Sequence, residues 1–83
     1  MHTSMDYLAI IETIIIKLKE NNHVELAEQV SKYRDAASTG GELLSSITHI
    51  LLDSIKTPAI SNLIGKEVFE LKRICNMNNI HVY

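Results

Sequence analysis

Residues 7–18 read Tyr-Leu-Ala-Ile-Ile-Glu-Thr-Ile-Ile-Ile-Lys-Leu, and this stretch decides between a helical and a β fold. The β-branched run Ile14-Ile15-Ile16 could also form a strand. A helical period extends over twelve residues with Lys and Glu flanking it, which favours a helix in which Ile16 stands off the apolar face. The side chains that fall on this face at three- and four-residue steps are Tyr7, Leu8, Ile10, Ile11, Ile14, Ile15 and Leu18.

Breaks and capping residues divide the chain into four predicted helices. The first is expected to begin near Thr3 or Ser4 and to end at Asn21-Asn22. Capping-box spacing recurs twice, at Asn22 with Glu25 and at Thr39 with Glu42. At the third break, Thr57 suits an N-cap and Pro58 the first helical position. The remaining predicted helices run from about His23 to Asp35, from Gly40 to Ile55 and from Pro58 to Asn76.

Each later segment also has an apolar face with helical spacing, which predicts an all-α fold. Short connections favour antiparallel neighbours, so we expect one compact antiparallel four-helix bundle over residues 1–83. The short C-terminal tail, residues 80–83, either packs in extended form or frays. Gly65 indicates either a close helix crossing or a slight kink. The apolar faces comprise Leu26, Ala27, Val30 and Tyr33, then Leu43, Leu44, Ile47, Ile50, Leu51 and Ile55, then Ile60, Leu63, Ile64, Val68, Leu71, Ile74 and Cys75.

Net charge and cysteine content indicate which class of partner and which cellular compartment to expect. The net charge is −2, with an acidic excess in residues 1–31, so no nucleic-acid partner is expected. A helix-turn-helix at the second and third helices would present Glu42, Ser45, Ser46, Thr48, His49 and Asp53, which suits DNA poorly. One cysteine, no signal peptide and no membrane-spanning run favour the cytoplasm. Met5 could be the natural start.

The chain contains no motif that predicts catalysis, a metal site or a cofactor. His2, His23, His49 and His81 lack the spacing of metal ligands, and Cys75 falls on an apolar face as a structural thiol would. Gly40-Gly41 lacks the strand and the Lys of a phosphate-binding loop. The carboxylate pairs, Glu25 with Glu28 and Glu67 with Glu70, lie among polar residues, and the second pair is typical of salt bridging within a helix. We therefore expect a protein that is not an enzyme.

Two blocks of sequence resemble a known class of protein. Residues 37–44, Ala-Ser-Thr-Gly-Gly-Glu-Leu-Leu, and residues 22–27, Asn-His-Val-Glu-Leu-Ala, are similar to stretches of small helical bacterial immunity-like proteins found beside polymorphic or contact-dependent toxins. The resemblance extends over residues 18–51, about half of the chain. It implies stoichiometric, non-covalent inhibition of a toxin made by the same cell.

A protein-binding module is therefore the leading functional prediction, with a cognate toxin as the partner. Acidic residues would form the rim of the contact and an aromatic side chain its anchor. An oligomeric regulatory or adaptor module of a phage or mobile element is the alternative, in which excess apolar surface would form a homodimer. The residues assigned to the rim are Glu20, Glu25, Glu28 and Asp35, and the anchor is Tyr33.

Overall fold

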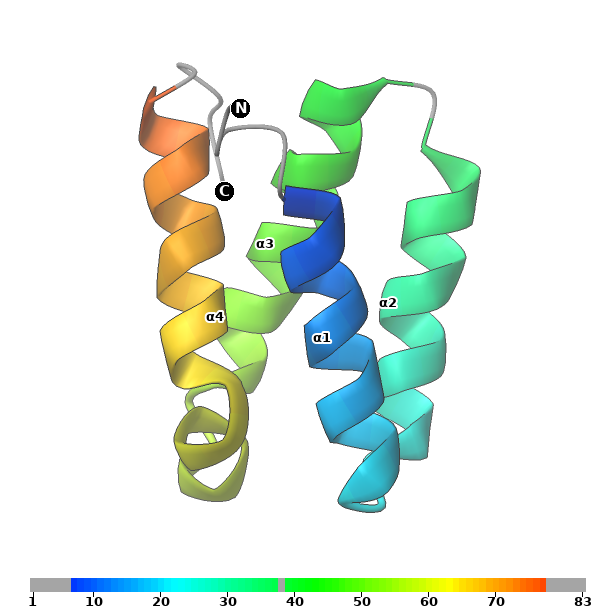
Figure 1. Ribbon diagram of the computed structural model, residues 1–83, viewed down its shortest axis with the longest axis vertical. Helices are drawn as coiled ribbons and strands as arrows, with labels where there is room; N and C mark the ends of the chain where they lie inside the picture. The colour runs from blue at the N-terminus through cyan, green and yellow to red at the C-terminus, as the bar shows by residue number, and fades with distance from the viewer. Residues whose placement is uncertain (1–6, 38, 78–83) are drawn as a thin grey trace.

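The computed structural model describes residues 7–37 and 39–77, and it confirms the all-α prediction. Consecutive helices run in opposite directions, as Figure 1 shows, and the described residues contain no strand. The predicted cap at Thr3 or Ser4 and the C-terminal tail lie outside the described residues. The helices are α1 (Tyr7–Glu20), α2 (Val24–Ala36), α3 (Gly40–Ser54) and α4 (Pro58–Met77).

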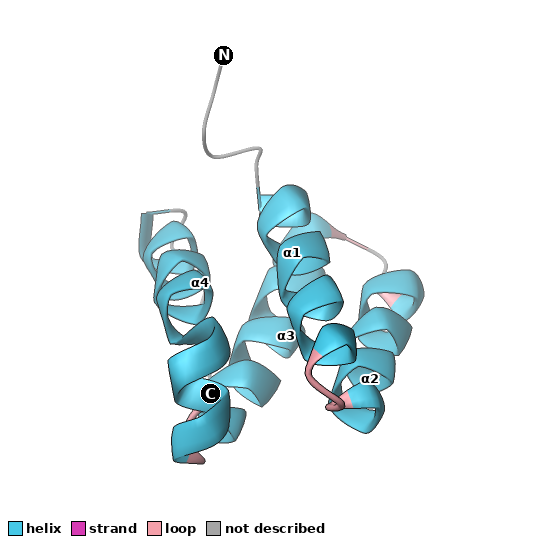
Figure 2. Ribbon diagram, turned by 60° about the horizontal axis from the view of Figure 1, so that its bottom comes forward, coloured by secondary structure: helices cyan, strands magenta, loops and turns pink. Residues whose placement is uncertain are grey.

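Each helix packs against two neighbours around a common core. The neighbouring pairs are α1 with α2, α2 with α3, α3 with α4, and α4 with α1, so α2 and α4 lie on opposite sides of the bundle (Figures 1 and 2). The radius of gyration of 11.8 Å matches the value of about 12 Å expected for a compact domain of this length. In the described part of the chain, no helix is long and apolar enough to cross a membrane.

The core is aliphatic. One contiguous cluster draws buried side chains from all four helices and includes Cys75. Thr48 is the buried polar residue among those described, and its Oγ1 lies 3.6 Å from Cys75 Sγ across the α3–α4 contact. Ile16 is exposed as predicted, but the placement of Leu8 on the apolar face of the first helix is wrong, because half of Leu8 is solvent-accessible. The fully buried large side chains are Ile11, Ile14, Leu18, Val30, Ile47, Leu51, Ile64, Val68 and Leu71.

The helix boundaries follow the predicted breaks, with one correction at the start of α2. Asn22 adopts a left-handed backbone conformation with φ of 68° and closes α1, so the N-cap of α2 is His23, which makes no side-chain cap hydrogen bond. The capping box predicted from Asn22 and Glu25 is therefore wrong. Thr39 does cap α3, since its Oγ1 accepts a hydrogen bond from the Glu42 amide at 3.1 Å. Pro58 is the first residue of α4, as predicted.

Two glycines lie in different surroundings. A Cβ built on Gly65 has Ser61 Oγ, in the preceding turn of α4, as its nearest described neighbour at 3.4 Å. That distance is ordinary van der Waals contact, so a close crossing with another described helix does not explain the glycine. A Cβ on Gly40 would lie 2.7 Å from the Tyr7 hydroxyl oxygen, which shows that the start of α1 rests against the start of α3.

Candidate protein-binding surface

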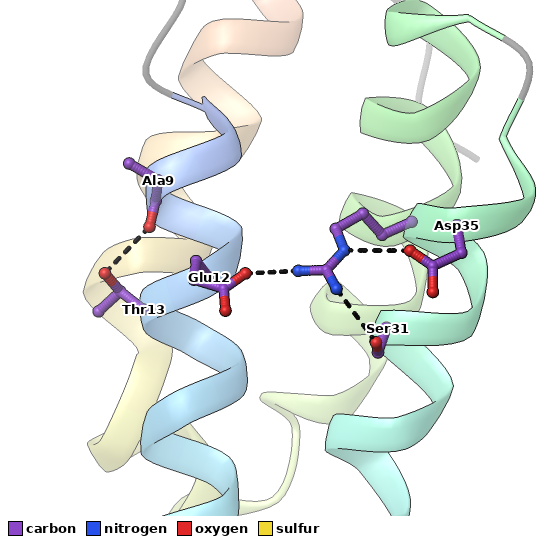
Figure 3. A network of polar contacts seen from close by, with 6 residues as sticks. Ala9, Glu12, Thr13, Ser31 and Asp35 are labelled. Carbon is purple, nitrogen blue, oxygen red and sulfur yellow. Dashed lines mark hydrogen bonds and ion pairs between the residues drawn. The ribbon is translucent and has the colours of Figure 1, made fainter.

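Arg34 organises the polar contact between α1 and α2. Its guanidinium pairs with Glu12 of α1, lies 3.5 Å from Asp35 Oδ1, and donates a hydrogen bond of 3.3 Å to Ser31 Oγ (Figure 3). Asp35 was predicted to belong to the binding rim, but part of its charge is already balanced by Arg34. Glu12 and Asp35 share this cation, so the rim at the C-terminal end of α2 is less acidic than the sequence alone indicates.

The other predicted rim residues are exposed and spread along the bundle. Glu20 ends α1, whereas Glu25 and Glu28 lie in the first two turns of α2. At 3.6 residues per turn, Glu28 and Asp35 fall on the same side of α2, and Glu25 lies about 60° from Glu28. Along the axis, Asp35 lies about 15 Å from Glu25. The structure therefore brings Glu25 and Glu28 together and leaves Asp35 at the far end of the helix.

Tyr33, the predicted anchor, lies on a different side of α2. It is rotated by about 140° from Glu28, toward the contact with α3. Its side chain is 42% exposed. Two hollows meet at this residue: one of about 260 Å³ is lined by Ala37, Glu42 and Ser46 as well as Tyr33, and one of about 270 Å³ is lined by Lys32 and Ala36 as well as Tyr33. Tyr33 is thus an exposed ring beside space that a partner's side chain could enter.

A third hollow lies at the turn between α1 and α2. It has a volume of about 300 Å³ and is lined by residues 22–26. Val24, at 45% exposure, places an apolar side chain there next to the carboxylate of Glu25. Val24 and Tyr33 thus place apolar surface near the two ends of α2, but on opposite sides of the helix, because nine residues turn it by about 180°.

The opposite side of the molecule has a feature that the sequence analysis missed. Phe69, on the outer side of α4, is 60% exposed, the largest fraction among the exposed large hydrophobic residues described. Lys66, Lys72 and Arg73 surround it at helical spacings of three and four residues. Phe69 does not fall on the apolar stripe of α4, and that displacement was the signal in the sequence. We name Phe69, Lys66, Lys72 and Arg73 the α4 patch.

The two carboxylates of α4 both form ion pairs. Glu70 pairs with Arg73 one turn later and raises the pKa of that guanidinium, whereas Glu67 accepts a hydrogen bond of 2.6 Å from Lys17 Nζ of α1. The prediction that Glu67 would pair within its own helix is wrong, because this partner comes from α1. Burial alone would raise the pKa of Glu67, but the hydrogen bond and charge of Lys17, together with a backbone hydrogen bond and the charge of Lys66, outweigh it, and the pKa lies below its ordinary value of 4.5.

The described residues do not cluster in the way that metal chemistry requires. Within residues 7–37 and 39–77, no group of three or more His, Cys, Asp and Glu side chains converges. His49 is exposed on α3 and His23 lies at the α1–α2 turn, while Cys75 is buried. Two exposed surfaces of this part of the chain combine charge with an aromatic ring: α2, with Glu25 and Glu28 on one side and Tyr33 on another, and the α4 patch.

Comparison with protein-family models, with curated proteins and with solved structures found no match for this chain. The resemblance to immunity-like proteins accordingly stays a prediction.

Proposed function

We propose that this protein is an immunity-type binder that neutralises a toxin by stoichiometric, non-covalent contact through α2. The observation that carries the proposal is the position of Tyr33, an exposed ring where two hollows meet. Tyrosine buries a large area with little loss of side-chain freedom and is enriched among residues that dominate binding energy. A partner's side chain that enters either hollow would contact this ring.

The carboxylates of α2 supply the charge of the proposed contact. Glu25 and Glu28 are exposed and lie on neighbouring sides of the first two turns of α2, with Glu20 at the end of α1. Exposed charges of one sign mainly accelerate association with an oppositely charged surface and exclude wrong partners. The expected partner surface is therefore basic, with an apolar or aromatic side chain that can reach Tyr33. Asp35 contributes less, because Arg34 partly balances it.

The first experiment is co-purification of the tagged protein from its native cells, with mass spectrometry of the companions. The proposal expects a stoichiometric partner that arrests growth when produced alone and is harmless when this protein is co-produced. Recovery of the protein without such a partner, or with a partner that is harmless when produced alone, would overturn the immunity function.

Variants then locate the contact on α2. Tyr33→Ala should weaken binding to the recovered partner at least tenfold, whereas Tyr33→Phe keeps the ring and should stay within about threefold of the parent. Glu25→Lys with Glu28→Lys should also weaken binding, mainly by slowing association. Asp53→Lys with Glu70→Lys is the matched control, since it makes the same change in net charge on α3 and α4. Equal losses from the two charge pairs would exclude α2 as the specific surface.

A further inference from the structure

The two hollows that meet at Tyr33 differ in charge. The hollow of about 270 Å³ is walled by the Tyr33 ring, the Ala36 methyl group and Lys32, so a second cation there would be repelled. The hollow of about 260 Å³ contains Glu42, and none of the described residues that line it is basic. We name this second space, lined by Tyr33, Ala36, Ala37, Glu42 and Ser46, the α2–α3 hollow. Its charge favours a cation.

Three features of the α2–α3 hollow attract positive charge. The carboxylate of Glu42, in the first turn of α3, carries the opposite charge. The exposed ring of Tyr33 presents a π system that attracts cations to its face. Helix α2 ends at Ala36, and because Ala36 and Ala37 line the hollow, the negative end of the helix dipole lies beside it.

Arginine suits this combination better than lysine does. Its planar guanidinium can stack on an aromatic ring and also donate two hydrogen bonds to one carboxylate, whereas the ammonium of lysine is a compact point charge. The hydroxyl oxygen of Ser46 offers a further acceptor in the wall of the hollow. A volume of about 260 Å³ lies below the range of about 300–1,000 Å³ that is usual for drug-sized ligands, so the hollow suits one side chain better than a whole small molecule.

We propose that the α2–α3 hollow binds an arginine side chain of the protein partner. The guanidinium lies against the Tyr33 ring and donates hydrogen bonds to the Glu42 carboxylate. The adjoining hollow, beside Lys32, then receives the apolar or aromatic side chain that is expected to reach Tyr33. That the partner is a toxin rests on the proposed function, whereas the preference of the hollow for arginine does not.

Titration of the protein alone with Nα-acetyl-arginine methylamide, followed by nuclear magnetic resonance, tests this preference. A single side chain makes few contacts, so we expect a dissociation constant of about 5 mM. The ring signals of Tyr33 and the backbone amide signals of Glu42 and Ser46 should shift most. The matched probe is Nα-acetyl-citrulline methylamide, which has nearly the same shape but no charge and should bind more weakly by a factor of about five or more. The corresponding lysine probe should bind more weakly by a factor of about two or more.

Substitutions separate the charge of the hollow from its shape. Glu42→Gln keeps the size of the side chain and the backbone amide that Thr39 caps, and it should weaken binding of the arginine probe by a factor of about five or more. Tyr33→Leu removes the ring but keeps an apolar side chain, and it should weaken binding about threefold. Asp53→Asn is the matched control, since it removes one exposed carboxylate about three turns further along α3 and should change the affinity by less than about twofold.

The outcomes separate this inference from the proposed function. Equal affinities for the arginine and citrulline probes, or signal shifts that gather at Glu25 and Glu28 instead, would contradict an arginine site in the α2–α3 hollow. An undiminished affinity of Glu42→Gln, with circular dichroism showing an intact bundle, would contradict it as well. Because the titration needs no partner, a specific arginine response together with a failed co-purification keeps the site and rejects the immunity function. A recovered toxin with no such response keeps the function and rejects the site.

Discussion

Glu67 of α4 and Lys17 of α1 form a contact between helices that depends on pH. The pKa of Glu67 is lower in the folded protein than its ordinary value of 4.5, so the charged carboxylate stabilises the fold. This contribution is complete above the pKa of the unfolded chain and disappears as the pH falls through the lower, folded value. Glu67→Gln should therefore lower the free energy of unfolding by about 0.5–1 kcal/mol at pH 7, since Lys17 is partly exposed.

Urea denaturation of the parent and Glu67→Gln between pH 3 and pH 7 measures this contribution. The difference in unfolding free energy should be constant above about pH 5.5 and shrink below pH 4.5. Asp53→Asn, which removes an exposed pair with Lys56, is the control and should change stability by less than about 0.5 kcal/mol. A difference for Glu67→Gln that persists at pH 3 would mean that packing rather than charge makes the contribution.

Gly65 is a position where the bundle can gain stability. The glycine lies within α4, is buried, and has only Ser61 Oγ among described atoms near an added Cβ, at an ordinary contact distance. Alanine restricts the unfolded chain and suits a helix better, so Gly65→Ala should raise the free energy of unfolding by about 0.5–1 kcal/mol. Urea denaturation checks the change.

Gly40→Ala is the control for this substitution. Its Cβ would lie 2.7 Å from the Tyr7 hydroxyl oxygen, so the ring must move and no comparable gain is expected. If Gly65→Ala proved destabilising instead, a neighbour would have to approach Gly65 more closely than the described residues do.

The roles of single residues were harder to predict from the sequence than the helices were. Asn22 can close one helix or cap the next, and the sequence alone does not distinguish these roles. The left-handed backbone conformation of Asn22 shows that it closes α1. Glu67 has basic neighbours within its own helix, but its partner is Lys17, fifty residues earlier. The rotation and height of α1 against α4 decide that pairing, and neither quantity is encoded in the local pattern.

At the level of helices, α1 shows that isoleucines close together in sequence can differ strongly in burial. Ile14 is fully buried, whereas Ile16, two positions later, is 48% exposed. Ile14→Ala should lower the free energy of unfolding by about 2–5 kcal/mol, because it removes buried methyl groups and leaves a cavity. Ile16→Ala should change it by less than about 1 kcal/mol, because most of its surface already meets water. Thermal unfolding would report the difference as a shift of about 4–8 °C per kcal/mol. Equal effects of the two substitutions would mean that the surface at Ile16 is covered in solution, as in an oligomer.

The helices themselves were largely predictable, because periodicity and caps act locally. Thr39 caps α3 through its hydroxyl, and Pro58 begins α4 as the pattern at Thr57-Pro58 predicts. Leu8 is the exception in α1, since it fits the three- and four-residue spacing but lies at the edge of the buried face. Spacing alone defines a stripe and does not define how much of its width the neighbouring helices cover.

On the scale of the whole molecule, the bundle was predictable because short connections leave few ways to bury four apolar faces. The candidate surfaces were not. Whether Tyr33 borders a hollow depends on how α2 rests against α3, and Phe69 became notable only once its exposure was known. Buried residues can be predicted from residue type and spacing. A binding surface depends on how the exposed residues of different helices are arranged in space, which type and spacing do not define.

The single core predicts that the bundle unfolds as one unit. All four helices contribute buried side chains to one cluster, so each helix loses part of its apolar contacts when a neighbour leaves. Urea unfolding followed by far-ultraviolet circular dichroism, which reports helix content, and by tyrosine fluorescence should give the same midpoint. Separate midpoints for the two signals would show that part of the bundle opens before the rest.

The burial of Cys75 against Thr48 means that the reactivity of this thiol can be used to measure how often the bundle opens. Cys75 is the only thiol of the chain and is completely buried against α3. A thiol reagent in solution can modify it only during the brief intervals when α4 separates from its neighbours. The rate of thiol labelling therefore measures how often α4 separates from its neighbours. The measurement uses the cysteine already present in the chain and needs no attached dye.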